Sequence, residues 1–226
     1  MNKFFLIGSS SYLLKNFEKF LTKNGIKFVS ISRKNNEGVN KIKKHYKTNY
    51  SNDSLKKIFN KEINNNIVPI FVFGNVITQS DLFINFHEKN IEKLIDVNIK
   101  LPIRILRIIL KNHLRNKPVF FNISSIRINP GVGFSLYGSS KIFMENLFQQ
   151  LSMEYGKLGC IFKSLRIGIS KGGIGKSLNE KVIKDYIKRT SINELIDIKE
   201  IYETLIFEID KKSSNGKVIY CDNGFF

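Results

Sequence analysis

The sequence alternates short apolar runs with stretches in which apolar residues recur at helical spacing, and this alternation constrains the fold more than any other feature. Apolar runs at 4–7, 26–31, 67–73, 119–123, 160–167 and 217–221 predict strands that are buried along their length. Between them, helical spacing over 12–22, 55–59, 83–114, 136–155 and 200–209 predicts helices. Such strands belong to parallel sheets that are covered on both faces. We therefore expect a doubly wound α/β fold, a parallel sheet of about seven strands with helices on both faces.

The chain shows no internal boundary. No repeat or low-complexity linker divides the 226 residues, so we expect one Rossmann-like domain over 1–226 with a core that needs no disulfides. Cys160 and Cys221 form no Cys-x-x-Cys pair and read as plain core residues, and the 3 histidines are scattered, so no metal site is expected. No apolar run is long enough for a membrane span or a secretory signal, which predicts a cytoplasmic protein with no membrane partner.

The net charge of +18 lies outside the ordinary range and raises the possibility of a nucleic-acid partner. The lysines, however, are spread along the chain, with only short groups such as Lys41, Lys43, Lys44 and Lys47. The chain has no Ala or Trp and is rich in Lys, Asn, Ile and Phe, a composition that indicates nucleotide bias in its genome. Because such a bias accounts for the many lysines, the charge is weak evidence for a nucleic-acid function. The positive field still favours anionic cofactors and substrates.

The carboxyl ends of the predicted strands are where a ligand should lie in such a sheet. These ends fall at Gly8, Ser32, Gly74, Ser124 and Gly168. The first turn, Gly8 followed by three serines, would place main-chain N–H groups and a helix N-terminus against a phosphate. An ordinary strand-to-helix turn with a serine N-cap is the alternative.

The end of the second strand carries Arg33 and Lys34 where NAD sites carry an acidic residue for the ribose 2'-hydroxyl. Arg33 could instead bind a 2'-phosphate through charge-assisted hydrogen bonds, which favours NADP(H) over NAD(H). Two solvated surface cations are the alternative.

Tyr137 and Lys141 are one helical turn apart at the start of a predicted helix, so their side chains share a face. An ammonium beside a phenol lowers the pKa of the phenol from about 10 and makes it a useful acid. Tyrosine and lysine are so frequent here that one such pair is expected by chance. Ser124 and Ser125 end the preceding strand and could hydrogen-bond a substrate carbonyl. Asn98 is either solvent-facing or satisfies main-chain groups where the helix is irregular near Pro102, which is expected to kink it.

Together these residues resemble the Asn, Ser, Tyr and Lys tetrad of the short-chain dehydrogenase/reductase family, and the resemblance covers nearly the full length. The matches, at intervals close to the family's, are Asn98, Ser125, Tyr137 and Lys141, with Ser124 as an alternative to Ser125. Residues 165–170 stand in place of the family's Pro-Gly segment. Residues 216–224 resemble the closing strand of single-domain reductases such as the 3-oxoacyl-acyl carrier protein reductases.

The resemblance implies an NADPH-dependent reduction of a ketone to an alcohol. Tyr137 would donate a proton to the oxygen, Lys141 would lower the pKa of Tyr137 and hold the nicotinamide ribose, Ser125 would polarise the carbonyl, and Asn98 would secure a water in the proton relay. The residues implied for cofactor binding are Gly8, Ser10, Ser11, Leu13, Arg33, Gly74, Tyr137, Lys141 and Ser170.

Two departures from the family pattern concern the cofactor. Tyr12 and Leu14 stand at the second and third glycines of the family's turn, and 73–75 reads Phe-Gly-Asn in place of Asn-Ala-Gly. The approach of a pyrophosphate near Tyr12 should therefore be wider than usual. The altered turn keeps a second hypothesis open, a catalytically impaired subunit or regulator of the same fold. The charge keeps a third open, a basic nucleic-acid-binding protein.

The substrate and the assembly follow only from the resemblance. A small carbonyl compound is expected, of 3-oxoacyl or nucleotide-sugar type, beneath a short lid at 171–192 that leaves the site rather open. A homo-oligomer, a dimer or tetramer, is expected through the helices at 83–114 and 136–155. Phe143, Leu147 and Leu151 could supply the core or the interface, and we favour assignment to the core.

Overall fold

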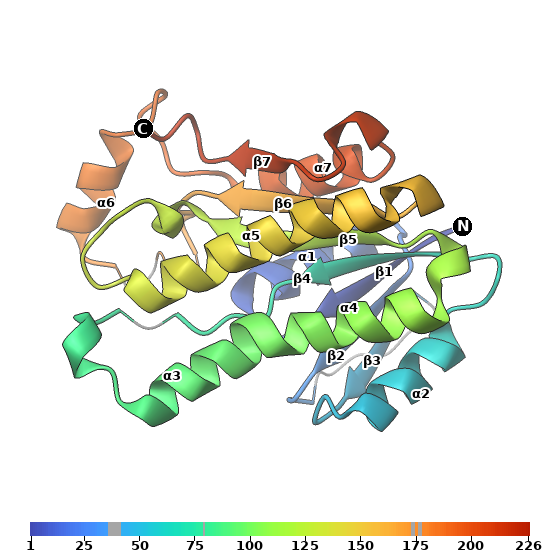
Figure 1. Cartoon of the computed structure of the whole chain (residues 1–226). Helices are drawn as coiled ribbons and strands as arrows, with labels where there is room; N and C mark the ends of the chain where they lie inside the picture. Colours follow the sequence, from blue (N-terminus) through green and yellow to red (C-terminus); the bar gives the residue numbers. More distant parts are fainter. Residues whose placement is uncertain (36–41, 79, 173–174, 176–177) are drawn as a thin grey trace.

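The computed structural model describes residues 1–35, 42–78, 80–172, 175 and 178–226. All strands belong to one parallel sheet in the order β3-β2-β1-β4-β5-β6-β7, with helices on both of its faces (Figure 1). The order reverses between β1 and β4, so the chain winds outward in both directions from the middle. The expected doubly wound α/β fold is confirmed.

The strands are short and mostly buried. They are β1 (Asn2–Ile7), β2 (Phe28–Ser32), β3 (Lys43–Lys47), β4 (Val68–Phe73), β5 (Val119–Ser125), β6 (Ile161–Ile167) and β7 (Val218–Cys221). Only β3 lacks a predicted counterpart, because its sequence Lys-Lys-His-Tyr-Lys carries charge instead of an apolar run. It pairs with β2 at the edge of the sheet, where charged side chains reach solvent. Lys41, in the same basic group, lies outside the described residues.

The α-helices are α1 (Tyr12–Lys23), α2 (Asn52–Glu62), α3 (Glu88–Ile95), α4 (Leu101–Asn112), α5 (Ser135–Tyr155), α6 (Glu180–Ile187) and α7 (Ile198–Glu208). Helix α6 lies within the segment 171–192 that the sequence analysis treats as a lid. Residues 173–174 and 176–177 of that segment lie outside the described part of the chain.

The region predicted as one helix over 83–114 is interrupted. A π-helical segment, η2 (Asp96–Lys100), joins α3 to α4, and the N–H of Leu101 bonds to the carbonyl of Asp96, five residues back. Pro102, predicted as a kink, instead occupies the first turn of α4, directly after the π-helical segment. The irregular turn therefore precedes the proline, and it directs Asn98 into the interior.

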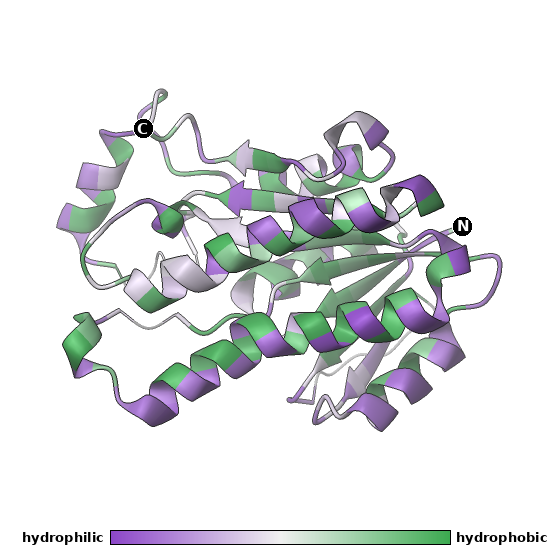
Figure 2. Ribbon diagram, viewed as in Figure 1, coloured by the Kyte–Doolittle hydropathy of each residue, from purple (hydrophilic) through white to green (hydrophobic). Residues whose placement is uncertain are grey.

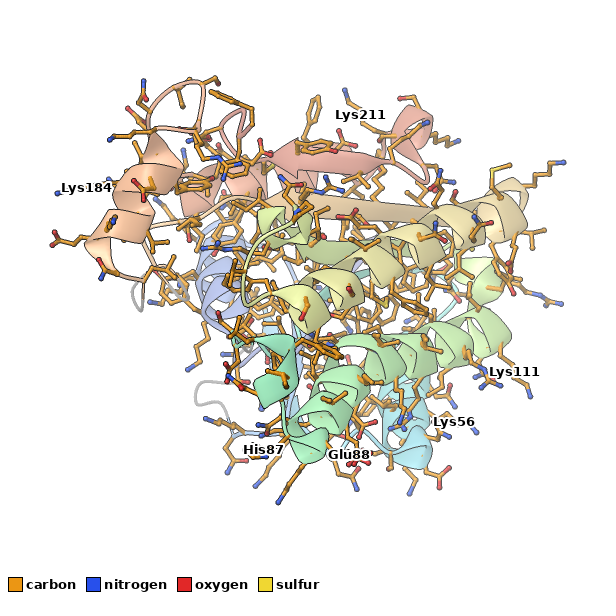
Figure 3. All side chains as sticks on the ribbon, turned by 60° about the vertical axis from the view of Figure 1, so that its left-hand side comes forward. Lys56, His87, Glu88, Lys111, Lys184 and Lys211 are labelled. Atoms are coloured by element: carbon orange, nitrogen blue, oxygen red, sulfur yellow. The ribbon has the colours of Figure 1, made fainter. Side chains whose placement is uncertain are left out.

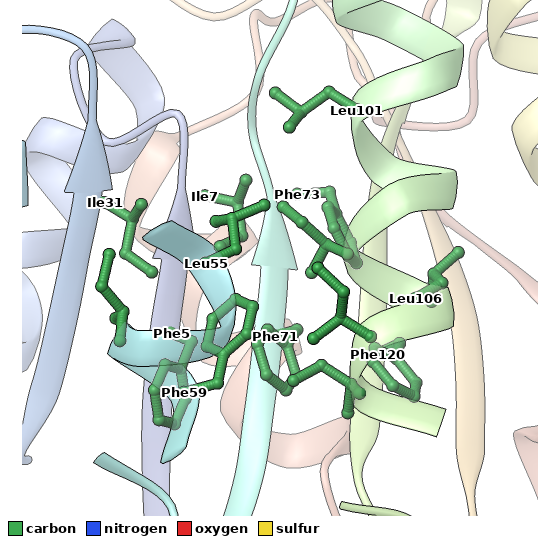
Figure 4. Packing of buried hydrophobic residues seen from close by; sticks show 14 of the residues in the cluster. Phe5, Ile7, Ile31, Leu55, Phe59, Phe71, Phe73, Leu101, Leu106 and Phe120 are labelled. Carbon is green, nitrogen blue, oxygen red and sulfur yellow. The ribbon is translucent and has the colours of Figure 1, made fainter. Parts of the chain in front are cut away.

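Two apolar clusters, one on each face, explain why the strands are apolar throughout. The first lies beneath α2, α4 and α5, and the second beneath α1 and α7. Figure 2 shows apolar strands between helices that carry both polar and apolar residues, and Figure 4 shows the first cluster. Within it, the stacked rings of Phe5, Phe71, Phe120 and Phe162 cross four neighbouring strands, with centroids 4.9 to 5.4 Å apart. Cys160 and Cys221 are buried free thiols, as expected.

The surface carries dispersed charge and some apolar side chains. In Figure 3 the labelled lysines project from different elements, Lys56 from α2, Lys111 from α4 and Lys184 from α6. Phe143 is 45% exposed, so its assignment to the core is wrong: its position on α5 faces away from the sheet. Leu147 and Leu151 lie at the margin of the core. Among the described residues, no helix is both long and apolar enough to cross a membrane.

Candidate active site

The carboxyl ends of the parallel strands meet at one edge of the sheet, and two adjoining cavities of about 420 Å³ each lie there. The first cavity lies between the end of β5, the start of α5 and the segment after β6. The second lies between the ends of β1 and β2 and the start of α4. Both are lined by Ser11, Gly74 and Val76, so together they form one crevice.

The crevice brings together every predicted site residue except Asn98. The first cavity is lined by Ser11, Leu13, Gly74, Ser124, Ser125, Tyr137, Lys141 and Ser170. The second cavity is lined by Gly8, Ser10, Ser11, Arg33 and Gly74. Asn98 lies behind the first cavity and is 3% exposed.

The turn between β1 and α1 presents main-chain donors to the crevice. Gly8 has a φ of +79°, and a Cβ there would come within 2.6 Å of the Cα of Asn75, so both the conformation and the space require glycine. Ser11 is the N-cap of α1 and accepts a hydrogen bond from the N–H of Leu14 at 3.4 Å. None of the described residues accepts a hydrogen bond from the N–H of Tyr12 or of Leu13. These donors and the helix dipole suit a phosphate.

The two large residues in this turn are accommodated in different ways. Leu14 is fully buried, and a Cβ on Gly74 would come within 2.6 Å of its Cδ1, so the glycine at 74 makes room for the leucine. The Tyr12 side chain is 42% exposed and lines the first cavity, with its hydroxyl against the backbone of Gly172. Its ring therefore borders the crevice and does not fill the turn.

Tyr137, in the first turn of α5, is 5% exposed and lines the first cavity beside Ser125. Burial raises the pKa of its phenol above the ordinary value of 10.0, while the Ser125 hydroxyl and the Arg127 guanidinium lower that pKa to a smaller extent. The lowered pKa expected from Lys141 is therefore wrong for this structure, because burial outweighs the nearby cation. The phenol is protonated at neutral pH.

Lys141 lies one turn further along α5, also buried. Its Nζ is 5.8 Å from the centre of the Tyr137 ring and donates a hydrogen bond to the carbonyl oxygen of Ile123 at 2.8 Å. Burial lowers the pKa of Lys141 to about 8, although the Glu145 carboxylate opposes the shift. An ammonium has three N–H donors, and the described residues accept from one of them.

Asn98 connects the exit of β4 to the start of α5. Its Oδ1 accepts from the N–H of Ile77 at 2.8 Å, and its Nδ2 donates to the carbonyl of Ile77 at 3.1 Å and to Ser140 Oγ at 3.0 Å. Ser140 Oγ donates in turn to the carbonyl oxygen of Tyr137 at 2.7 Å. Asn98 thus satisfies main-chain groups of Ile77 after β4, not those of the irregular helix as the sequence alternative has it, and fixes the turn that carries the phenol.

Three cations line the second cavity. Lys100 pairs with Asp96 at 2.9 Å, and Arg104 donates to the carbonyl oxygen of Tyr50 at 2.9 Å. Arg33 follows β2, is exposed, and forms neither a hydrogen bond nor an ion pair with the described residues. Its guanidinium is therefore open to an anionic group in this cavity.

Two buried polar atoms in the crevice have no hydrogen-bond partner among the described residues. They are Oγ of Ser124 in the first cavity and Oδ1 of Asn75 in the second. Buried polar groups are rarely left unpaired, because their desolvation is costly. Their positions in both cavities fit a crevice that receives a polar ligand along its whole length.

Arg127 is a residue of the site that the sequence analysis does not identify. It belongs to η4 (Ile126–Ile128), directly after β5, and its side chain lines the first cavity. Its N–H donates to Ser125 Oγ at 3.2 Å, and its guanidinium lies 4.4 Å from the centre of the Phe134 ring. Because the chain is so basic, one more arginine does not stand out in the sequence as a site residue. Its place two residues after a serine at a strand end is the signal that could have revealed it.

The family model for short chain dehydrogenases matches residues 5–183. The chain belongs to the short-chain dehydrogenase family. The expectation of an enzyme of this oxidoreductase family is thereby confirmed. Among curated relatives, 3-oxoacyl-acyl-carrier-protein reductase FabG of Rickettsia conorii is 25% identical over 205 residues, covering 87% of this chain and 85% of the relative. The 17-beta-hydroxysteroid dehydrogenase type 3 of Danio rerio is 25% identical over 75% of this chain and 61% of that protein.

Solved structures of this family share the fold. The structure of ElxO with NADP bound has a TM-score of 0.85 at 19% identity and covers 99% of this chain and 98% of ElxO. A short chain dehydrogenase from Leptospira borgpetersenii with bound NAD+ has a TM-score of 0.84 at 12% identity, over 99% of this chain and 92% of that one. At identities this low, the likeness to these solved structures shows a shared fold and nothing more about this short-chain dehydrogenase.

Proposed function

We propose that this short-chain dehydrogenase is an NADPH-dependent reductase that converts the carbonyl group of a small molecule into an alcohol. The observation that carries the proposal is the placement of Ser125, Tyr137 and Lys141 in the same crevice as the main-chain donors of the β1–α1 turn. A proton donor and a phosphate-binding turn that line one crevice suit a dinucleotide reductase.

The cofactor would lie across both cavities. Gly8, Ser10, Ser11 and the N–H of Leu13 would hold the pyrophosphate, and Gly74 would border it. Tyr137, Lys141 and Ser170 would surround the nicotinamide end in the first cavity. When bound, a reduced nicotinamide supplies the hydride that the carbonyl carbon accepts.

A preference for NADP(H) over NAD(H) is supported by Arg33. Its exposed guanidinium in the second cavity suits a 2'-phosphate, and the field of a chain with a net charge of +18 favours the more anionic dinucleotide. The similar ElxO structure holds NADP, whereas the Leptospira structure holds NAD+.

The reaction divides among the side chains of the first cavity. Ser125 would hold the carbonyl oxygen, and its position beside the phenol favours it over Ser124. Tyr137 would give its proton to that oxygen while the carbon gains the hydride, so the C=O bond becomes a CH–OH group and one proton is drawn from solvent. The Lys141 ammonium would stabilise the phenolate that remains, and Asn98 would hold the Tyr137 turn in place.

The assembly is supported by apolar surface on the two long helices. Leu110 of α4 and Leu147, Leu151 and Tyr155 of α5 line one groove, and Phe143 of α5 is exposed near it. Covering such a surface with a second copy would bury apolar area, as a homo-oligomer requires. A dimer or tetramer through α4 and α5 stays a prediction, and so does the cytoplasmic location.

Consumption of NADPH by the purified protein, with a panel of 3-oxoacyl thioesters, oxo acids and nucleotide-sugar ketones, tests the proposal. We expect at least one class to be reduced, and the alcohol to form in equal amount to the NADPH consumed. A protein that binds neither NADPH nor NADH would contradict the proposal and support the regulatory subunit that the altered turn leaves open.

A further inference from the structure

Arg127 is fixed between the two residues proposed to handle the carbonyl. Its main-chain N–H donates to Ser125 Oγ at 3.2 Å. A Cβ on Gly138 would come within 2.7 Å of the carbonyl oxygen of Arg127, so η4 packs directly on the first turn of α5, beside Tyr137. The arginine side chain therefore starts at a defined place next to the hydroxyl and the phenol.

The guanidinium of Arg127 is held on one face and open at its edge. It stacks on the Phe134 ring at 4.4 Å, and both side chains line the first cavity. A stacked guanidinium keeps its N–H donors in the plane of the group, at its edge, where they can bind a planar carboxylate with two hydrogen bonds.

No carboxylate of the described residues pairs with Arg127, although its side chain is half-buried. Arg166 provides the contrast, because it also stacks on an aromatic ring, that of Tyr220 at 4.8 Å. Its guanidinium is neutralised by Glu145 through bonds of 3.1 and 2.6 Å. Arg166 is therefore a structural ion pair, whereas Arg127 brings an uncompensated charge into a cavity, which is costly unless an anion joins it.

A second arginine adds to the positive field. Arg189, in the segment after α6, lies near enough to Arg127 that repulsion between them helps to lower the pKa of Arg127, although burial is the larger cause. Arg189 is held by the Phe225 ring at 4.5 Å and by the carbonyl oxygen of Phe226 at 3.0 Å. Arg189 is exposed and does not line the cavity, so it adds only to the general positive field around Arg127.

We propose that the substrate is a small oxo acid whose carboxylate binds the guanidinium of Arg127 while its carbonyl oxygen lies between Ser125 and Tyr137. This inference rests on the proposed reductase function and narrows its substrate class. The apolar side chains of Ile126, Ile169 and Leu178 line the same cavity and suit the hydrocarbon part of the molecule. A 3-oxoacyl thioester is neutral near its reacting carbonyl and would leave Arg127 without a partner.

The test compares an acid with its neutral ester in four proteins: wild type, Arg127→Gln, Arg127→Lys and Arg115→Gln. Arg115 is exposed and lies outside the crevice, so Arg115→Gln removes the same charge elsewhere. With acetoacetate and methyl acetoacetate as probes, we expect the wild type to favour the acid in kcat/KM by at least about tenfold. Arg127→Gln should raise KM for the acid by about tenfold or more and abolish the preference for the acid over the ester, and Arg127→Lys should keep part of the preference.

Thermal shift by acetoacetate in the presence of NADP+ gives a readout that does not depend on turnover. The acid should stabilise the wild type and Arg115→Gln but not Arg127→Gln. An ester reduced as well as the acid, or equal acid binding with and without Arg127, would overturn this inference and leave the reductase function standing. No reduction of either probe or of any other carbonyl compound, with acid binding still dependent on Arg127, would contradict the reductase function alone.

Discussion

The two halves of the crevice differ in what they require of their side chains. The half formed by β5, η4 and α5, here the catalytic half, presents a serine, a phenol and an amine, and the proposed reaction gives each functional group a role of its own. The half formed by β1, its following turn and β2, here the cofactor half, offers main-chain N–H groups to the proposed cofactor, and it carries Tyr12 and Leu14 where the family pattern has glycines. A site built on main-chain groups tolerates new side chains where a neighbour makes room, as Gly74 does for Leu14.

The largest effect is expected from Tyr137→Phe in the catalytic half. Loss of the proton donor should lower kcat by about a thousandfold or more, while Kd for NADPH changes less than about twofold, because the ring stays in place. Stopped-flow turnover and fluorescence titration measure the two quantities. Tyr155→Phe, at the far end of α5, is the control and should turn over normally. Equal turnover of both variants would remove the phenol from the mechanism.

Lys141→Met tests the buried amine through the pH dependence of stability. The pKa of Lys141 is lowered from 10.5 to about 8 in the folded protein. Below about pH 8 the folded state therefore carries a costly buried charge, and this cost fades as the pH rises toward 10.5. Between pH 7 and pH 10, the free energy of unfolding of the wild type should rise relative to that of Lys141→Met by up to about 3 kcal/mol. Urea unfolding of both proteins at these two pH values measures it, and parallel curves would refute the shift.

Gly74→Ala tests the tolerance of the cofactor half. The new Cβ would lie 2.6 Å from Leu14, so we expect a loss of about 1–3 kcal/mol in the free energy of unfolding. Adding Leu14→Ala should recover much of that loss relative to the sum of the single changes. Gly131→Ala, whose new Cβ would make only an ordinary contact with the carbonyl oxygen of Asn129 at 3.8 Å, is the control. Strict additivity of the two changes would show that the residues do not compensate each other.

Arg33→Gln should lower the preference for NADPH over NADH by about tenfold, through weaker NADPH binding only. Titration with both cofactors measures the ratio, and Arg115→Gln controls for the lost charge. An unchanged ratio would identify Arg33 as a solvated surface cation. Lys100 or Arg104 would then determine the preference between the two cofactors.

Tyr12→Gly should have the smallest effect, a two- to fivefold tighter NADPH binding, because a phosphate could approach the N-terminus of α1 more closely. Tyr12→Phe keeps the bulk and should bind as the wild type does. Weaker binding by Tyr12→Gly would mean that the tyrosine contributes to cofactor binding, and the contrast between the halves would then be smaller than stated.

Much of the fold could be predicted from the sequence, because strands that are buried on both faces of the sheet have continuous apolar sequences. β3 was not predicted, since an edge strand rich in lysine resembles a solvated loop. The π-helical turn at Asp96–Lys100 was not predicted either, because one extra residue in a turn leaves the apolar pattern almost unchanged. These two unpredicted elements differ in consequence. β3 is peripheral, whereas the π-helical turn places Asn98.

The sequence predicts those features of the site that depend on the order of the residues. It does not predict the features that depend on distances and burial in the folded chain. The order of Asn98, Ser125, Tyr137 and Lys141 indicates a family. The pKa of Tyr137 depends on how deeply the phenol is buried, which the spacing to Lys141 does not reveal. Arg127 can be recognised as a site residue only from the structure, which shows that it stacks on Phe134 and that no carboxylate of the described residues pairs with it.

Fluorescence titration of the unmodified protein with NADPH and NADH tests the central claim most directly, namely that the crevice holds a reduced dinucleotide despite Tyr12 and Leu14. We expect saturable binding of both, with NADPH bound about tenfold more tightly. Absence of saturable binding by either cofactor would contradict the account and leave a dehydrogenase fold whose crevice serves another purpose.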